Sequence, residues 1–223
     1  MNGSPGTSHL TTVLTVVGIA GVFIAALIIG VRSGRKHEKA VREFAQAQGW
    51  SFSRNATQEH TPEVEQLFPD EKFSLTYIME IERGRRKVYL FDGTYRHRAG
   101  RSGGWPASVC LIESERLESV DSRVEIIARN WVDATLLRKQ VDMGDSEFAR
   151  NFIVLSQDAA SARRILSQPV QAALLAHRDR ALAYRVQIAL GKGRAALLAG
   201  GIDEQQRWRD LVDLGRAIES AVQ

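Results

Sequence analysis

Residues 75–95, LTYIMEIERGRRKVYLFDGTY, contain two apolar runs that are separated by a short polar break around Gly84. In the second run, the side chains of residues 88–91 (VYLF) fall alternately on two faces, which is the two-residue period of a β-strand. Glycine among polar residues favours a tight turn. The stretch therefore predicts an antiparallel hairpin whose strands are residues 75–81 and 87–95.

Similar patterns on both sides of this hairpin predict more strands. Short strands are expected at residues 50–53 and 107–112, and a second hairpin is expected from strands 181–190 and 194–199 around the turn Gly191, Lys192 and Gly193. Residues 148–155 read as a strand that is buried on both faces. Residues 124–128 fit either a strand or the start of a helix, because a short apolar run suits both.

Helices are predicted between and after these strands. A period of 3.6 residues marks an amphipathic helix over residues 35–48, and a stripe of apolar side chains marks a C-terminal helix: Trp208, Leu211, Val212, Gly215, Ile218 and Val222. Thr61 and Pro62 predict the start of a short helical turn. Capping residues or a proline predict the starts of three further helices, at Asp158, Pro169 and Asp203. Hairpins combined with such helices indicate an α+β fold on a largely antiparallel sheet.

The N-terminal part contains an apolar segment long enough to span a membrane. Residues 10–31 form a run of 22 residues without a charged, Asn, Gln or Pro side chain. As a helix, the run would extend about 33 Å, and a bilayer core is about 30 Å thick. A signal peptide is the main alternative, but residues 1–9 lack Lys and Arg and the run exceeds the usual length of about 7 to 15 residues. We therefore expect a single transmembrane helix that is not cleaved.

The basic residues of the chain cluster directly after this segment. Residues 32–42 carry five bases and one acid, a net charge of +4. The whole chain also has a net charge of +4, and residues 1–31 carry no charged side chain, so residues 43–223 are neutral. The bases are candidate contacts for anionic lipid headgroups: Arg32, Arg35, Lys36, Lys39 and Arg42. The positive-inside rule alone also explains them, and it places the N-terminus outside and the C-terminal domain in the cytoplasm, at the plasma membrane.

These features predict four parts of the chain: a short external N-terminus (1–9), the transmembrane helix (10–31), a basic juxtamembrane helix (32–48) and a cytoplasmic domain (49–223). Gly18, Gly21 and Ala25 share one face of the predicted transmembrane helix, and small residues at this spacing permit a homodimer. Nucleic acid is not an expected partner, because a nucleic-acid-binding domain would carry its basic excess on the fold itself.

A second group of bases follows the first predicted hairpin. Arg96, Arg98 and Arg101 lie in a loop rich in Gly and Ser, and they are a candidate basic patch for lipid or a partner. Bases on an exposed strand also protect it from pairing with other chains. Further arginines lie at the turn of residues 83–86, which the predicted hairpin places at the opposite end of strand 87–95.

No motif in the sequence indicates catalysis, a metal or a cofactor. The five histidines show neither an HExxH motif nor a Cys partner at the spacing of a zinc site. Cys110 lies among apolar residues, as a small core residue would, and a single cysteine forms no internal disulfide. The acid clusters at residues 113–125 and 142–145 resemble solvated surfaces rather than a general acid and base.

Several short motifs carry a resemblance to a protein family. They are Gly49-Trp50-x-Phe52, Phe68-Pro69, Phe91-Asp92-x-x-Tyr95, and the stretch EFARNFIV at residues 147–154 followed by Asp158. Together they resemble a group of uncharacterised bacterial membrane proteins with one or two spanning helices and a cytoplasmic α+β domain of unknown function. This sequence has Gly93 and Thr94 where the family strand is richer in tyrosine. The resemblance implies architecture and location, and it carries no activity.

The sequence therefore predicts a single-pass membrane protein whose cytoplasmic domain is a non-catalytic binding or scaffolding module within a larger membrane complex. Two alternatives stay open. One is an enzyme that acts on a membrane-associated or anionic substrate with acids and arginines far apart in the sequence. The other is a peripheral sensor of anionic lipid that uses the loop of Arg96 to Arg101.

Overall fold

The computed structural model describes residues 33–54, 57–98, 104–120, 122–129, 140–200 and 204–222. The described residues fall into two units, which divide between Glu43 and Phe44. Residues 33–48 are helical, which confirms the predicted amphipathic helix of residues 35–48. Gly49, with φ +67°, ends the helix, and the Trp50 amide donates to the Ala45 carbonyl over 2.8 Å. A glycine in this left-handed conformation is the common end of a helix.

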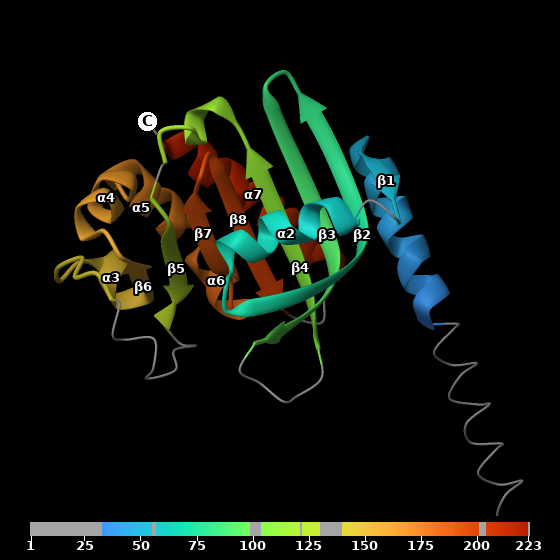
Figure 1. The fold of residues 1–223 in the computed structure, drawn as a ribbon, viewed down its shortest axis with the longest axis horizontal. Helices are drawn as coiled ribbons and strands as arrows, with labels where there is room; N and C mark the ends of the chain where they lie inside the picture. Colours follow the sequence, from blue (N-terminus) through green and yellow to red (C-terminus); the bar gives the residue numbers. More distant parts are fainter. Residues whose placement is uncertain are drawn as a thin grey trace, which may run out of the picture. The chain divides into compact units, whose positions relative to one another are not determined.

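The second unit is built on one eight-stranded sheet, in the order β1-β2-β3-β4-β8-β7-β5-β6 (Figure 1). Every neighbouring pair of strands is antiparallel. The strands are β1 (Ser51–Ser53), β2 (Glu71–Arg83), β3 (Arg86–His97), β4 (Trp105–Glu113), β5 (Val124–Ala128), β6 (Phe152–Ser156), β7 (Gln187–Gly191) and β8 (Arg194–Gly200). The predicted antiparallel sheet and both hairpins are confirmed, and the strand alternative for residues 124–128 is the correct one.

Helices occupy the connections of this sheet. They are α2 (Thr57–Leu67), α3 (Glu147–Asn151), α4 (Ala159–Ile165), α5 (Gln168–Ala176), α6 (Arg178–Ala183) and α7 (Glu204–Ala221), with a 3-10 turn η1 (Glu115–Leu117). Asp158 caps α4 as predicted, because its Oδ1 accepts from the amides of Ala160 and Ser161, both over 3.0 Å. Pro169 lies in the first turn of α5, where a proline costs no backbone hydrogen bond.

The two faces of the sheet are covered by different helices. On one face, α2 contributes Val64, Leu67 and Phe68 to a core with the residues of β3 and β4 that point the same way, such as Phe91 and Val109. The alternate residues of β3 and β4 face α7. Figure 1 shows α2 lying across the front of the sheet, with α7 behind it.

Helix α7 buries the apolar stripe that the sequence predicts. Trp208, Leu211, Ile218 and Val222 are all buried. Gly215 lies so close to the sheet that a Cβ there would be 2.6 Å from Cδ1 of Ile112. This confirms the predicted inward face of the C-terminal helix.

Three predicted elements are wrong in their bounds. Residues 147–151 form helix α3 rather than the start of a strand, because the Ser146 Oγ accepts from the Ala149 amide over 3.1 Å and caps a helical turn. Residues 178–183 form α6, so strand β7 begins only at Gln187. Helix α2 begins at Thr57 and contains Pro62, so Thr61 and Pro62 do not open it.

No helix within the described ranges is long and apolar enough to cross a membrane. The predicted transmembrane helix of residues 10–31 lies outside those ranges, together with Gly18, Gly21, Ala25 and Arg32.

Candidate functional site

A cavity of about 440 Å³ lies beside the outermost strand β6, and we call it the sheet-edge cavity. Its wall combines apolar and charged side chains, the main ones being Val141, Ala149, Phe152 and Val154 together with Arg129, Asp142, Asp145 and Arg150. Its size falls within the range of about 300 to 1,000 Å³ that is usual for ligand pockets. The cavity is therefore large enough for a small molecule or for a side chain of a partner protein.

Backbone contacts hold the rim of this cavity in place. The Val141 amide donates to the Val154 carbonyl over 2.8 Å, and Gln140 forms an antiparallel bridge with Leu155. These contacts extend the sheet beyond β6. At Gly144, which has φ +74°, the chain turns, and its amide donates to Oδ1 of Asp142 over 2.8 Å.

The two arginines of the cavity differ in their surroundings. Arg150 pairs with Asp145 over 3.3 Å, but both side chains are exposed, so the pair contributes only about 0 to 1 kcal/mol. Arg129 donates from Nε and Nη2 to the Ala149 carbonyl over 3.1 and 2.7 Å. Among the described residues, Arg129 has no carboxylate within ion-pair distance. The cavity wall thus combines apolar side chains with an arginine that has no carboxylate partner among the described residues, which suits a ligand with an apolar body and an anionic group.

The predicted juxtamembrane contacts lie on the helix of residues 33–48. Arg35 and Lys36 are exposed. Lys39 is 3.6 Å from Glu43, and Arg42 is 3.3 Å from Glu38 on the same helix. Each of these two bases thus faces an acid one turn away, and contact of any of the four with lipid remains a prediction.

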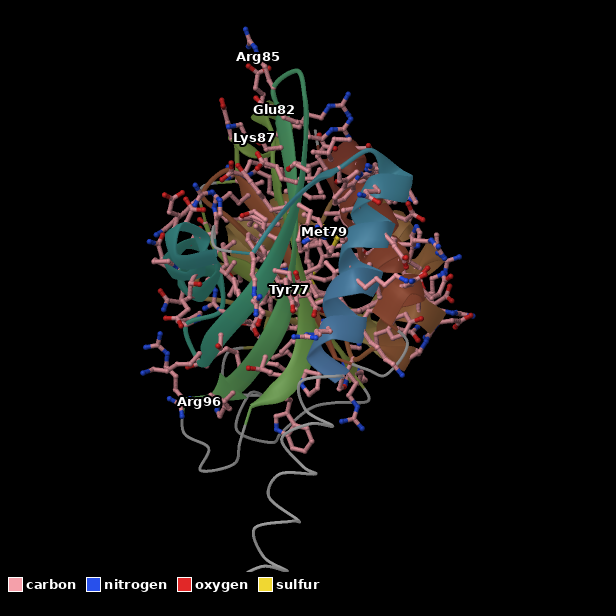
Figure 2. The ribbon with its side chains drawn as sticks, turned by 90° about the vertical axis from the view of Figure 1, so that its right-hand side faces the viewer. Tyr77, Met79, Glu82, Arg85, Lys87 and Arg96 are labelled. Atoms are coloured by element: carbon pink, nitrogen blue, oxygen red, sulfur yellow. The ribbon has the colours of Figure 1, made fainter. Side chains whose placement is uncertain are left out.

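The structure describes two of the three residues of the predicted basic patch, and these two differ in their contacts. Arg96 is exposed at the end of β3 (Figure 2). Arg98 donates from Nη2 to Glu65 over 3.0 Å and from Nε to the Glu71 carbonyl over 3.2 Å, so it ties the end of β3 to α2 and β2. Arg101 lies outside the described residues.

A buried polar cluster lies between the sheet and α7, and sequence reasoning did not find it. Ser108 on β4 donates to Oδ1 of Asp92 on β3 over 2.8 Å. Its Oγ accepts from Nη2 of Arg207 over 3.0 Å and from Nε1 of Trp208 over 2.9 Å. All four residues are almost fully buried, with Asp92 the most exposed at 5%. A polar cluster sealed in this way fixes the packing of α7 on the sheet.

The chain next to Asp92 explains the glycine at position 93. A Cβ on Gly93 would lie 2.3 Å from the carbonyl oxygen of Ser74 on β2. The register of β2 against β3 shifts between Leu75 and Tyr77, opposite this point. Only glycine permits the two backbones to approach so closely.

Cys110 is a core residue, as predicted. It is fully buried, and burial raises the pKa of its thiol to about 12. The thiolate, which is the nucleophilic form, is therefore scarce at neutral pH.

Most of the acids considered above have partners in the fold. Glu113 pairs with Arg194 over 2.6 Å, Glu125 pairs with Arg123 over 2.6 Å, and Glu115 pairs with Arg85. Within the described part of the chain, no three His, Cys, Asp or Glu side chains gather closely enough to hold a metal ion.

Fold and cavity together define an α+β domain with a sealed polar core and an amphipathic pocket at one sheet edge. Residues 114–200 match a family described as "Protein of unknown function (DUF3137)", which agrees with the predicted resemblance to an uncharacterised family. This segment includes every residue of the sheet-edge cavity. No curated protein matches the sequence.

A solved structure shares the fold over most of the chain. It is the crystal structure of the mycobacterial trehalose monomycolate transport factor A, TtfA, with a TM-score of 0.57 at 9% sequence identity. The similarity covers 83% of this chain and 94% of TtfA. At such low identity, the likeness extends to the fold alone.

Proposed function

We propose that this protein is a membrane-tethered, non-catalytic binding module that holds a partner at the membrane through its sheet-edge cavity. The observation that carries the proposal is the composition of the cavity wall, in which apolar side chains are combined with the Arg129 guanidinium. Such a site can bind an apolar group that ends in an anion, and catalysis is not needed to explain it.

Two further observations support the proposed place of this module in an assembly at the membrane. The apolar run of residues 10–31 and the bases that follow it favour attachment to a membrane with the domain on the cytoplasmic side. The fold is shared with a protein that is named a transport factor. A module that holds components of a transport assembly together is consistent with both observations.

Recovery of partners by the full-length protein in a mild detergent tests the proposal. We expect mass spectrometry to find one partner in stoichiometric amount with the wild-type protein. The substitution Arg129→Gln should reduce its recovery about tenfold, since a hydrogen bond to a charged group contributes about 1.5 to 3 kcal/mol.

Lys72→Gln is the control, because it removes the same charge from an exposed position outside the cavity. It should leave the recovery unchanged. Isolation of the wild-type protein alone, or equal losses in the two variants, would contradict the proposal.

A further inference from the structure

A second cavity, of about 240 Å³, lies at the turn end of the β2–β3 hairpin, and we call it the arginine cavity. Arg85 and Arg86 reach it from the hairpin, Ser114 and Arg116 from the segment after β4, and Glu219 from the end of α7. Figure 2 shows Arg85 at this end of the molecule and Arg96 at the opposite end of β3. Among the described residues, none lines both cavities.

The charges around the arginine cavity do not cancel. Arg86 pairs with the buried Glu219 over 2.9 Å, and Arg85 pairs with Glu115 at the exposed rim. Arg116 donates only a long hydrogen bond of 3.4 Å, from Nη1 to the Ser220 carbonyl. Among the described residues, no carboxylate lies within ion-pair distance of Arg116. The cavity therefore keeps one net positive charge.

Ser114 supplies an independent observation that points to a ligand site. Its side chain is 9% exposed, and its Oγ is buried without a hydrogen-bond partner among the described residues. Ser114 precedes the 3-10 turn η1, yet its hydroxyl does not cap that turn. Buried hydroxyl groups in folded proteins are nearly always hydrogen-bonded, so one that lines a charged cavity calls for an explanation.

We infer that the arginine cavity binds a phosphate group. Arg116 would donate charge-assisted hydrogen bonds to the phosphate oxygens, and the Ser114 hydroxyl would donate a further one. Arg86 adds a second guanidinium at the wall, although Glu219 already binds it. The volume lies below the range of about 300 to 1,000 Å³ that is typical of sites for whole small molecules. The site therefore fits inorganic phosphate or the phosphate of a lipid headgroup.

Calorimetric titration of the full-length protein in a nonionic detergent tests this inference. One titration uses sodium phosphate and the other a short-chain phosphatidate, each against sodium chloride at equal ionic strength. We expect both phosphate compounds to bind. A lower Kd for the phosphatidate would identify a headgroup site, whereas an equal or lower Kd for inorganic phosphate would identify a site for the free anion.

Three variants make the test specific. Arg116→Gln should raise the Kd about tenfold, which corresponds to about 1.4 kcal/mol, and Ser114→Ala should raise it a few-fold. Lys72→Gln removes one exposed charge at the start of β2, far from the hairpin turn, and should leave the Kd unchanged. In phosphate-free buffer, Ser114→Ala should keep or raise the melting temperature, because it removes a hydroxyl that has no partner. Loss of phosphate binding in this variant would then not be a folding defect.

Four results would overturn the inference. The first is the absence of phosphate binding to the wild-type protein, and the second is an unchanged Kd in Arg116→Gln. The third is an equal weakening by Lys72→Gln, which would show general charge attraction instead of a site. A folding defect of Ser114→Ala in phosphate-free buffer would show that its hydroxyl is already bonded and would remove the reason for the site.

Discussion

Replacing Arg207 by methionine tests the buried polar cluster between the sheet and α7. The Arg207 side chain is 1% exposed, and its Nη2 lies 3.7 Å from Oδ1 of Asp92. Methionine fills similar space without a charge. The substitution leaves the Asp92 carboxylate inside the protein without its buried guanidinium, although Ser108 and Trp208 still donate to it.

The expected loss of stability is large. Breaking a buried ion pair by removing one partner costs about 3 to 5 kcal/mol, because an uncompensated charge stays in the interior. In a unit of this size, each kcal/mol lowers the melting temperature by about 2 to 4 °C. We therefore expect Arg207→Met to melt about 6 to 20 °C below the wild-type protein.

Thermal unfolding followed by circular dichroism measures this difference, and Arg209→Met is the matched control. Arg209 lies on the same helix, is exposed, and its guanidinium lies over the Phe44 ring at 5.8 Å, a contact worth about 0.5 to 1 kcal/mol. Asp92→Asn combined with Arg207→Met should lose less stability than the sum of the two single variants. If Arg207→Met loses no more than Arg209→Met, the cluster does not stabilise the fold as argued.

Three further predictions concern single positions. Gly93→Ala should lower the free energy of unfolding by about 3 kcal/mol, measured by urea unfolding, because the new Cβ meets the Ser74 carbonyl; a loss below about 1 kcal/mol would refute this. Cys110 should react with a maleimide only in the unfolded protein, since burial raises the pKa of its thiol to about 12, and rapid labelling of the native protein would contradict its core position. Burial raises the pKa of Glu71 above 4.5 against the opposing effect of His97, so the folded state holds that proton to higher pH than the unfolded state. The contribution of Glu71 to the stability of the wild-type protein then falls as pH rises from 4.5. The stability of Glu71→Gln relative to the wild-type protein should therefore increase from pH 4 to pH 7. A constant difference in melting temperature would show that Glu71 titrates normally.

The first hairpin could be predicted because its information is local. Residues 75–95 alternate with a two-residue period around Gly84, and Gly84 has φ +64° in the turn. Helix α3 could not be predicted in the same way. Its five residues run directly into the apolar strand β6, and apolar residues of such a short stretch fit either structure.

The candidate sites depend on contacts between distant parts of the chain, which one sequence does not reveal. Asp92 stands in an apolar strand, an unusual place for a charge, but its partners are 16 and 116 positions away. Arg129 and Arg150 line the same cavity because Ala128 on β5 pairs with Phe152 on β6, which brings the end of β5 beside α3. Nothing in the sequence indicates that Ser114 belongs to a site, because a buried hydroxyl without a partner can be recognised only in the structure.

The place of β8 within the sheet determines how the chain can be divided. The family match of residues 114–200 ends with β8 and leaves out β4, which pairs with β8 through seven residue pairs. It also leaves out α7, which packs on both strands. A polypeptide limited to the matched segment would present the amides and carbonyls of β8 uncovered, next to apolar side chains such as Leu197 and Leu198. Open strands of this kind recruit one another, so the isolated segment should aggregate, and its folding must depend on sequence from both flanks.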